Sequence, residues 1–167
     1  MDILHFYRRP ILSQSDKNSL LHVLRDIFSF DVLDIDTEYC FNVGVIEELS
    51  RDELDILRWL LSETFEPENF SSVSFLGQVS ETGGFVVEVG PRMNFTTAWS
   101  TNAVSICHGC GLKKIVRIER SRRYKLYTNR RDLRREILLR EFGEEYLRFL
   151  NLIHDRMTEC EYLEPLK

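Results

Sequence analysis

Two cysteines separated by two residues, Cys107 and Cys110, form the C-x-x-C pattern of thiol redox sites and of zinc sites. A redox pair needs its first thiol at a helix N-terminus, where the helix dipole lowers the thiol pKa. Here the pair falls at the end of a predicted helix, where the dipole opposes the thiolate. A zinc site needs a second pair of ligands, and the other cysteines, Cys40 and Cys160, are isolated. We therefore interpret the pair as small residues at a helix end, and we predict no metal site.

Polar side chains gather at the start of the same predicted helix. Arg92 follows a Gly-Pro turn, and Ser100, Thr101 and Asn102 crowd the first helical turn. Backbone N–H groups and the helix dipole could hold an anion there, with Arg92 as a further contact. The alternative is that hydroxyl groups only cap the helix while Arg92 pairs with a carboxylate, and the residues alone favour this alternative.

The rest of the chain offers no catalytic set. His5, His22 and His154 have no serine or cysteine nucleophile pattern near them. Neither G-x-S-x-G nor the phosphate-binding pattern G-x-x-x-x-G-K occurs in the sequence. We therefore predict no catalytic residue in this chain.

Basic residues alternate along a predicted strand–turn–strand segment. The net charge of −5 is uneven, because residues 1–90 hold six basic and 17 acidic side chains whereas residues 91–167 hold 16 basic and 10 acidic. This asymmetry indicates either an anionic partner for the second half or packing between the halves. The alternative function is a basic-face nucleic-acid-binding module or a stand-alone scaffold module, although few aromatic residues accompany the basic ones, as nucleic-acid binding would favour. The alternating residues are Arg117, Arg120, Arg122, Arg123 and Lys125.

The candidate residues must be positioned by strands and helices. The residue pattern of the first half of the chain predicts strands and helices in alternation. Apolar residues at period two indicate strands, and apolar stripes at helical spacing behind Ser caps indicate helices. Ser50 and Glu53 match a capping box. We expect a strand at 3–7, a helix from Ser13 or Ser15 to Phe28, an acidic linker at 31–38, a strand at 39–46 and a helix that buries Leu54, Leu57, Leu61 and Trp59 and ends before Pro67.

The second half repeats this order after a segment rich in Asn, Ser, Gly and Thr at 66–84, which holds a short predicted strand at 73–79. A left-handed stop is expected at Gly111, because glycine adopts that backbone at low cost. We expect a strand at 85–89, a helix at 98–110 with Trp99, Ala103, Ile106, Cys107 and Cys110 on its apolar face, strands at 114–119 and 123–127 around a turn at 120–122, a helix at 130–155 bent near Gly143, and an edge strand within 157–162.

The fold class that follows is α+β, with antiparallel strands packed against helices. Two similar lobes are predicted, one at residues 1–75 and one at 76–167, which together make one domain. Hydrophobic content of 43% supports a proper core. No apolar run approaches a membrane span, and four cysteines without a secretory signal indicate a reducing compartment. We therefore expect a cytoplasmic location and no membrane partner.

Three segments of the chain closely resemble, in order, the N-terminal region of the eukaryotic-type phosphoribosylformylglycinamidine synthases. The opening residues 4–7 and the strand at 40–43 are similar to the start of that family as well, so the resemblance runs from about Ile3 to Tyr162. The three segments are 89–102 (VGPRMNFTTAWSTN), 117–124 (RIERSRRY) and 154–159 (HDRMTE).

The resemblance implies a function within a large glutamine-dependent amidotransferase of purine biosynthesis. Such enzymes convert formylglycinamide ribonucleotide to its amidine with ATP, magnesium and ammonia released from glutamine. Their N-terminal domain resembles a fused, duplicated copy of the small subunit of split bacterial systems. It lies between the synthetase and glutaminase domains and helps to organise ammonia transfer. Those two domains are the implied partners, in cis or in trans, and nucleic acid is not.

The glutaminase nucleophile and the ATP and metal ligands of the family lie in other domains. The resemblance therefore implies no cofactor in this chain, and ATP and magnesium only in the full enzyme. The positions that match the motifs are polar and lie at turns and helix starts, so we expect them to face the synthetase domain or the ligand region without making bonds. The charged segment 130–148 departs from the family pattern, and its role stays open. The matching positions are Arg92, Ser100, Thr101, Asn102, Arg117, Arg122, Arg123, Tyr124, Asp155, Arg156, Thr158 and Glu159.

Overall fold

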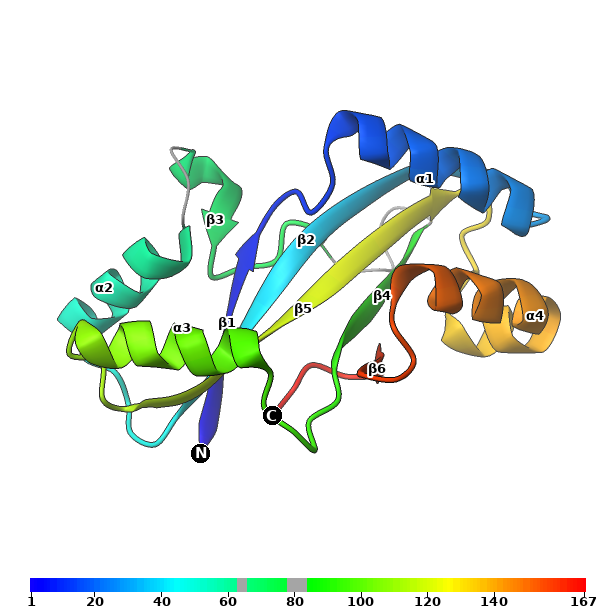
Figure 1. The fold of residues 1–167 in the computed structure, drawn as a ribbon. Coiled ribbons are helices and arrows are strands. Elements are labelled where there is room, and N and C mark those ends of the chain that lie inside the picture. Colours follow the sequence, from blue (N-terminus) through cyan, green and yellow to red (C-terminus); the bar gives the residue numbers. More distant parts are fainter. Residues whose placement is uncertain (63–65, 78–83) are drawn as a thin grey trace.

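One antiparallel sheet organises the chain, with strand order β3-β1-β2-β5-β4-β6. The structure is a computed structural model that describes residues 1–62, 66–77 and 84–167. Four α-helices accompany the sheet in this described part (Figure 1). The elements are β1 (Asp2–Arg8), α1 (Gln14–Ile27), β2 (Val32–Val45), α2 (Arg51–Ser62), the 3₁₀ turn η1 (Pro67–Asn69), β3 (Phe70–Ser71), β4 (Gly84–Pro91), α3 (Ala98–Gly109), β5 (Ile115–Thr128), α4 (Arg135–Ile153) and β6 (Glu159–Tyr162). The α+β class is confirmed.

The two longest strands, β2 and β5, pair along almost their whole length at the centre of the sheet. Tyr39 lies opposite Arg122 near the middle of this pairing. Directly opposed residues of antiparallel strands point to the same face. Four buried apolar positions of β2 recur in β5, each at a position 83 residues later in the chain. The repeated pairs are Val32 and Ile115, Ile35 and Ile118, Phe41 and Tyr124, and Val43 and Leu126.

Helices pack on this face in two pairs, one near each end of the central strands (Figure 1). The helices α1 and α4 form one hydrophobic cluster with β4 and with one end of β2 and β5. The helices α2 and α3 form the second cluster with β1 and with the opposite end of the same strands. Both clusters therefore draw residues from each side of residue 75, and the division into lobes at that residue stays a prediction.

The opposite face of the sheet carries buried polar side chains. Successive residues of a strand alternate between faces, so Glu38 and Asn42 point away from the helices. Residues 74–76 cover Glu38: the hydroxyl of Ser74 donates to its carboxylate at 2.5 Å, and the backbone N–H of Phe75 donates at 2.8 Å. Lys125 is buried and donates from Nζ to the Leu76 carbonyl at 2.7 Å. Hydrogen bonding of this kind is what allows charged groups to stay buried.

Two predictions about the central strands are wrong. Residues 32–38 belong to β2 and do not form an acidic linker, and β5 runs through residues 120–122 without a turn. In both places charged side chains suggested a solvent-exposed loop. The charges have partners within the fold, because Glu38 pairs with Arg123 at 2.7 Å and Arg122 pairs with Glu159 at 2.6 Å.

Other sequence predictions hold at the helix ends. Ser13 caps α1, and Ser50 and Glu53 form the reciprocal capping box of α2. Gly111 adopts φ of +87°, as a left-handed stop requires. The helix α4 carries its non-helical residue at Phe142, beside Gly143.

The predicted helix faces were less accurate, because part of each predicted stripe faces solvent. Trp59 is 74% exposed and Ile106 is 58% exposed, so neither is a core residue, and Cys110 is exposed too. The long C-terminal helix begins at Arg135, later than expected, and the edge strand is confirmed as β6. Of the predicted strand at 73–79, residues 73–77 are not in a strand, and residues 78 and 79 lie outside the described residues.

Candidate interdomain interface

The three motif segments, distant in sequence, meet at one edge of the sheet. Arg92 donates from its backbone N–H to the Thr158 carbonyl at 2.9 Å and from Nη2 to the Arg156 carbonyl at 3.0 Å. Arg122 donates from Nη2 to both carboxylate oxygens of Glu159, at 2.6 and 2.7 Å. The same carboxylate accepts the backbone N–H of Asp155 at 3.0 Å. Six of the predicted site residues therefore form one junction between β4, β5 and the turn before β6.

Arg117 fixes the segment between β4 and α3. Its guanidinium donates to the backbone carbonyls of Met93 and Phe95 and lies 3.4 Å from the buried carboxylate of Glu119. Glu119 also accepts the backbone N–H and the hydroxyl of Thr97, at 3.1 and 3.0 Å. The sequence prediction did not include Thr97 or Glu119, although Thr97 precedes the helix and matches a cap.

The start of α3 is occupied by contacts within the chain. Thr97 is the N-cap and accepts the backbone N–H of Ser100 at 3.0 Å. Ser100 is fully buried, and its Oγ accepts the N–H of Ile118 at 3.2 Å. Thr101 donates back to the Thr97 carbonyl, while Asn102 is exposed. The hydroxyl groups thus cap and anchor the helix, as the interpretation without a bound anion predicts. That interpretation also paired Arg92 with a carboxylate, whereas the Arg92 side chain donates to the Arg156 carbonyl.

The last two predicted site residues, Arg123 and Tyr124, make their main contacts elsewhere in the sheet. Arg123 is on the opposite face of the sheet, where Nη1 donates to Glu38 at 2.7 Å and to Ser74 at 2.8 Å. Burial raises the pKa of Glu88, whose carboxylate lies 3.5 Å from the Arg123 Nε. Tyr124 is buried on the helix face, edge-on to Phe149. Its ring packs within the hydrophobic cluster of α1 and α4, while its hydroxyl interacts with Arg122 and Glu159 of the junction.

A hollow of about 370 Å³ opens beside the Tyr39–Arg122 pair, where β4 ends and the chain crosses to α3. Its lining includes Arg120, Trp99 and Glu159. The guanidinium of Arg120 lies 4.5 Å from the ring centroid of Tyr39 and 5.0 Å from that of Trp99. The sequence could not reveal this grouping, because it depends on the register between β2 and β5.

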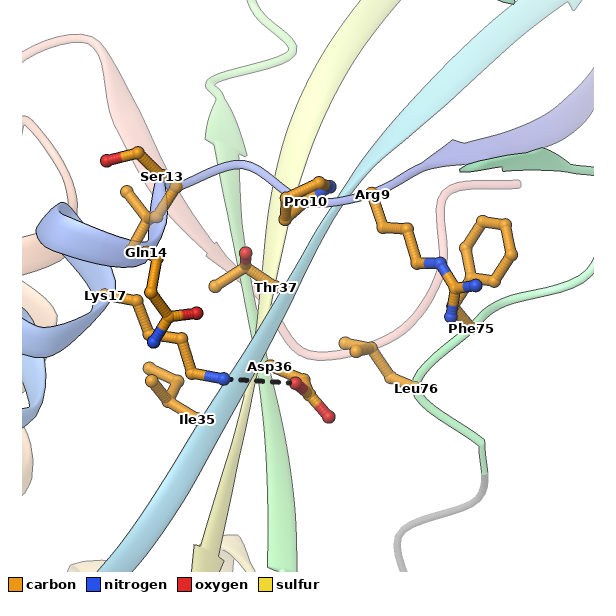
Figure 2. Close-up of a pocket in the computed structure, with 11 residues that line it drawn as sticks. Arg9, Pro10, Ser13, Gln14, Lys17, Ile35, Asp36, Thr37, Phe75 and Leu76 are labelled. Atoms are coloured by element: carbon orange, nitrogen blue, oxygen red, sulfur yellow. Dashed lines mark ion pairs between the residues drawn. The ribbon is translucent and has the colours of Figure 1, made fainter. Parts of the chain in front are cut away.

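A second hollow, of about 270 Å³, lies where β1 ends and the chain crosses to α1. Figure 2 shows Lys17 of α1 reaching toward Asp36, while Arg9 lies against the ring of Phe75. The Lys17 Nζ is 3.2 Å from Asp34 and 3.8 Å from Asp36, so its charge is balanced by two carboxylates. These contacts hold α1 and residues 74–76 against the edge of β2.

A sequence model of the formylglycinamide ribonucleotide amidotransferase N-terminal family matches residues 38–165. The chain belongs to this family. It is 43% identical over 167 residues to the Arabidopsis thaliana protein named probable phosphoribosylformylglycinamidine synthase, chloroplastic/mitochondrial, and 46% identical over 173 residues to the Dictyostelium discoideum phosphoribosylformylglycinamidine synthase. Identity to the Homo sapiens phosphoribosylformylglycinamidine synthase is 31% over 170 residues. These alignments cover 99%, 100% and 99% of this chain but only 11–12% of each relative.

In this member of the amidotransferase N-terminal family, the two buried thiols are poorly suited to nucleophilic chemistry. Burial raises the pKa of Cys107 to about 11 and that of Cys40 to about 12. A thiol with such a pKa carries almost no thiolate at neutral pH. Among the described residues, no three His, Cys, Asp or Glu side chains are grouped to hold a metal ion, and no helix is long and apolar enough to cross a membrane.

Proposed function

We propose that this chain is the N-terminal assembly domain of a phosphoribosylformylglycinamidine synthase. The observation that carries the proposal is alignment of the whole chain with about one ninth of three such synthases. In this role the domain holds the synthetase and glutaminase domains in the arrangement through which ammonia passes. The geometry is consistent with assembly, because the motif residues bind the chain's own turns and carbonyls, as residues that shape a surface do.

The reaction of the whole enzyme is part of the same proposal. Formylglycinamide ribonucleotide, ATP and glutamine would yield formylglycinamidine ribonucleotide, ADP, phosphate and glutamate, with magnesium bound in the other domains. No cofactor is assigned to this chain. Its partners are the synthetase and glutaminase domains, whether they continue the same polypeptide or join as a separate one.

We also propose that the domain is a fused pseudo-dimer. The order strand, helix, strand, helix occurs twice, and the two copies place their long strands side by side at the centre of the sheet. The buried apolar positions of β2 recur 83 residues later in β5, and the central pair Tyr39 and Arg122 has the same separation. That separation favours a two-fold axis through this pair, as expected if one small subunit had duplicated.

A cytoplasmic location is proposed for the assembled enzyme from the sequence alone. The printed name of the Arabidopsis relative places that protein in chloroplasts and mitochondria. Microscopy of a fluorescent fusion of the complete protein from the source organism would distinguish these locations, and an organelle signal would contradict the cytoplasmic one.

Reconstitution tests the proposed function. The purified chain is mixed with a polypeptide that contains the remaining domains of the synthase, and glutamine-dependent formation of formylglycinamidine ribonucleotide is measured. We expect activity that depends on both parts and saturates with added chain. Ammonium salt in place of glutamine is the control, because it supplies ammonia without transfer between domains. Equal glutamine-dependent activity with and without the chain would contradict the proposal.

A further inference from the structure

The centre of the helix face carries a row of side chains that belongs mainly to neither helix pair. Arg8, Tyr39 and Arg122 lie opposite one another across β1, β2 and β5, so they point to the same side. Arg120 follows two residues before Arg122 on β5 and shares this face. The hydrophobic clusters of α1 with α4 and of α2 with α3 lie on either side of the row. All four of these side chains are partly exposed.

Arg120 differs from the other arginines of β5. Arg117, Arg122 and Arg123 each lie within 3.5 Å of a carboxylate oxygen. Within residues 1–62, 66–77 and 84–167, the Arg120 side chain makes no hydrogen bond or ion pair; its guanidinium lies over the rings of Tyr39 and Trp99. A guanidinium held between two rings is fixed in orientation, while the N–H groups at its edge remain available to bind an anion.

The hollow beside Arg120 suits a carboxylate better than a nucleic acid strand. The rings of Tyr39 and Trp99, which could stack on bases, are already in contact with guanidinium groups. Arg8 lies 5.3 Å and Arg120 4.5 Å from the centroid of Tyr39, and Arg120 lies 5.0 Å from that of Trp99. Glu119 and Glu159, which line the same hollow, are already paired with Arg117 and Arg122. Arg120 therefore offers one guanidinium for one acidic group, and not a row of cations for a chain of phosphates. A single carboxylate can reach one guanidinium edge and form two parallel hydrogen bonds there.

We propose that Arg120 is the anchor for a carboxylate of an acidic segment in the remaining part of the synthase, which docks over the Tyr39–Arg122 row. The inference rests on the proposed function, because the relatives extend about eight times the length of this chain beyond the aligned region. A partner polypeptide is therefore expected against one of its faces, and this row is partly exposed and carries the Arg120 guanidinium without a carboxylate partner among the described residues.

Binding in trans tests the anchor. The dissociation constant between the chain and the remaining synthase polypeptide is measured by titration calorimetry for the wild type, Arg120→Gln and Arg120→Lys. We expect Arg120→Gln to weaken binding by about tenfold or more and Arg120→Lys by less, because lysine keeps the charge but lacks the planar fork. Arg148→Gln is the matched control, since Arg148 is an exposed residue of α4 outside the row. Circular dichroism checks that each variant is folded.

The outcomes separate this inference from the function on which it rests. If the wild type binds but Arg120→Gln binds equally well, the anchor is wrong and the assembly function stands. If the wild type neither binds nor restores activity, the assembly function itself fails. The same Arg120→Gln comparison with a single-stranded RNA of mixed sequence is a third arm. Specific RNA binding that Arg120→Gln abolishes, at physiological salt, would overturn the choice of a carboxylate partner.

Discussion

The guanidinium of Arg122 donates from one nitrogen to both carboxylate oxygens of Glu159, and this pair ties the centre of the sheet to the turn that precedes its last strand. The two side chains are 28% and 20% exposed, so water screens the pair only in part. Glu159 in turn accepts the backbone N–H of Asp155 and shapes the turn. The pair therefore couples two of the three family motifs.

Replacing Arg122 with Gln should destabilise the chain by about 1–2 kcal/mol, because Glu159 would keep its partly buried charge without its cationic partner. The free energy of unfolding in urea measures the loss. The Arg134–Glu136 pair is a matched control, since its side chains are 71% and 80% exposed. Arg134→Gln should therefore leave the unfolding curve unchanged. Equal effects of the two substitutions would contradict a structural role for the Arg122 pair.

The Glu88 carboxyl should make the stability of the chain depend on pH. Burial raises its pKa in the folded protein above the value of about 4.5 that it has when exposed. The folded state thus favours the protonated form, and this contribution is complete below the unfolded pKa and is lost as pH rises through the folded pKa. Glu88→Gln imitates the protonated form, so its stability relative to the wild type should increase from pH 4 toward neutrality.

Urea unfolding at pH 4, 5, 6 and 7 measures this difference for Glu88→Gln. The control is Glu136→Gln, because Glu136 is an exposed carboxylate on α4. A constant difference between Glu88→Gln and the wild type across this range would show that Arg123 and Ser121, which lower the Glu88 pKa, fully offset the effect of burial.

Gly111 and Gly109 form a matched pair for testing the helix stop. A Cβ at either position would meet no atom within 4 Å, but only Gly111 has a positive φ, of +87°. Gly111→Ala should therefore cost about 1 kcal/mol through backbone strain alone. Gly109→Ala, inside the last turn of α3, should be neutral or slightly stabilising. Thermal unfolding of both variants measures the contrast, and equal losses would exclude the backbone explanation.

The four free cysteines should react with a thiol reagent in a definite order. Cys110 is exposed, whereas Cys107 and Cys40 are buried and burial raises their pKa. With an aromatic disulfide reagent at pH 8, Cys110 should react at once and the two buried thiols only after denaturant is added. Absence of the early phase in Cys110→Ser identifies it. Rapid reaction of Cys107 in the native protein would instead support an active C-x-x-C pair.

The sequence predicted correctly those features of the fold that depend on a few neighbouring residues. The caps at Ser13 and Ser50 and the stop at Gly111 each depend on neighbouring residues, so the helix ends were predictable. The pairing of β2 with β5 was not, because it joins residues about 70 or more positions apart, from Val45 with Ile115 to Val32 with Thr128. Without that register, Glu38 looked like part of a solvent-exposed linker, although Arg123 and Ser74 hold it in the interior.

The same limit applied to the candidate interface. Family motifs pointed to Arg92, Arg122 and Glu159, and the structure brings these together. Motifs also pointed to Ser100 and Tyr124, which are buried, and periodicity alone gave no indication of it. Tyr39 and Arg120 become visible as a group only once three strands are placed in register.

Both hydrophobic clusters take residues from either side of residue 75. The segments before and after that residue therefore share their cores, and neither has a complete core of its own. Severing the chain there should leave two peptides that are each largely unstructured in isolation. Mixed together, they are expected to reassemble as a heterodimer, as the proposed duplication of one small subunit requires.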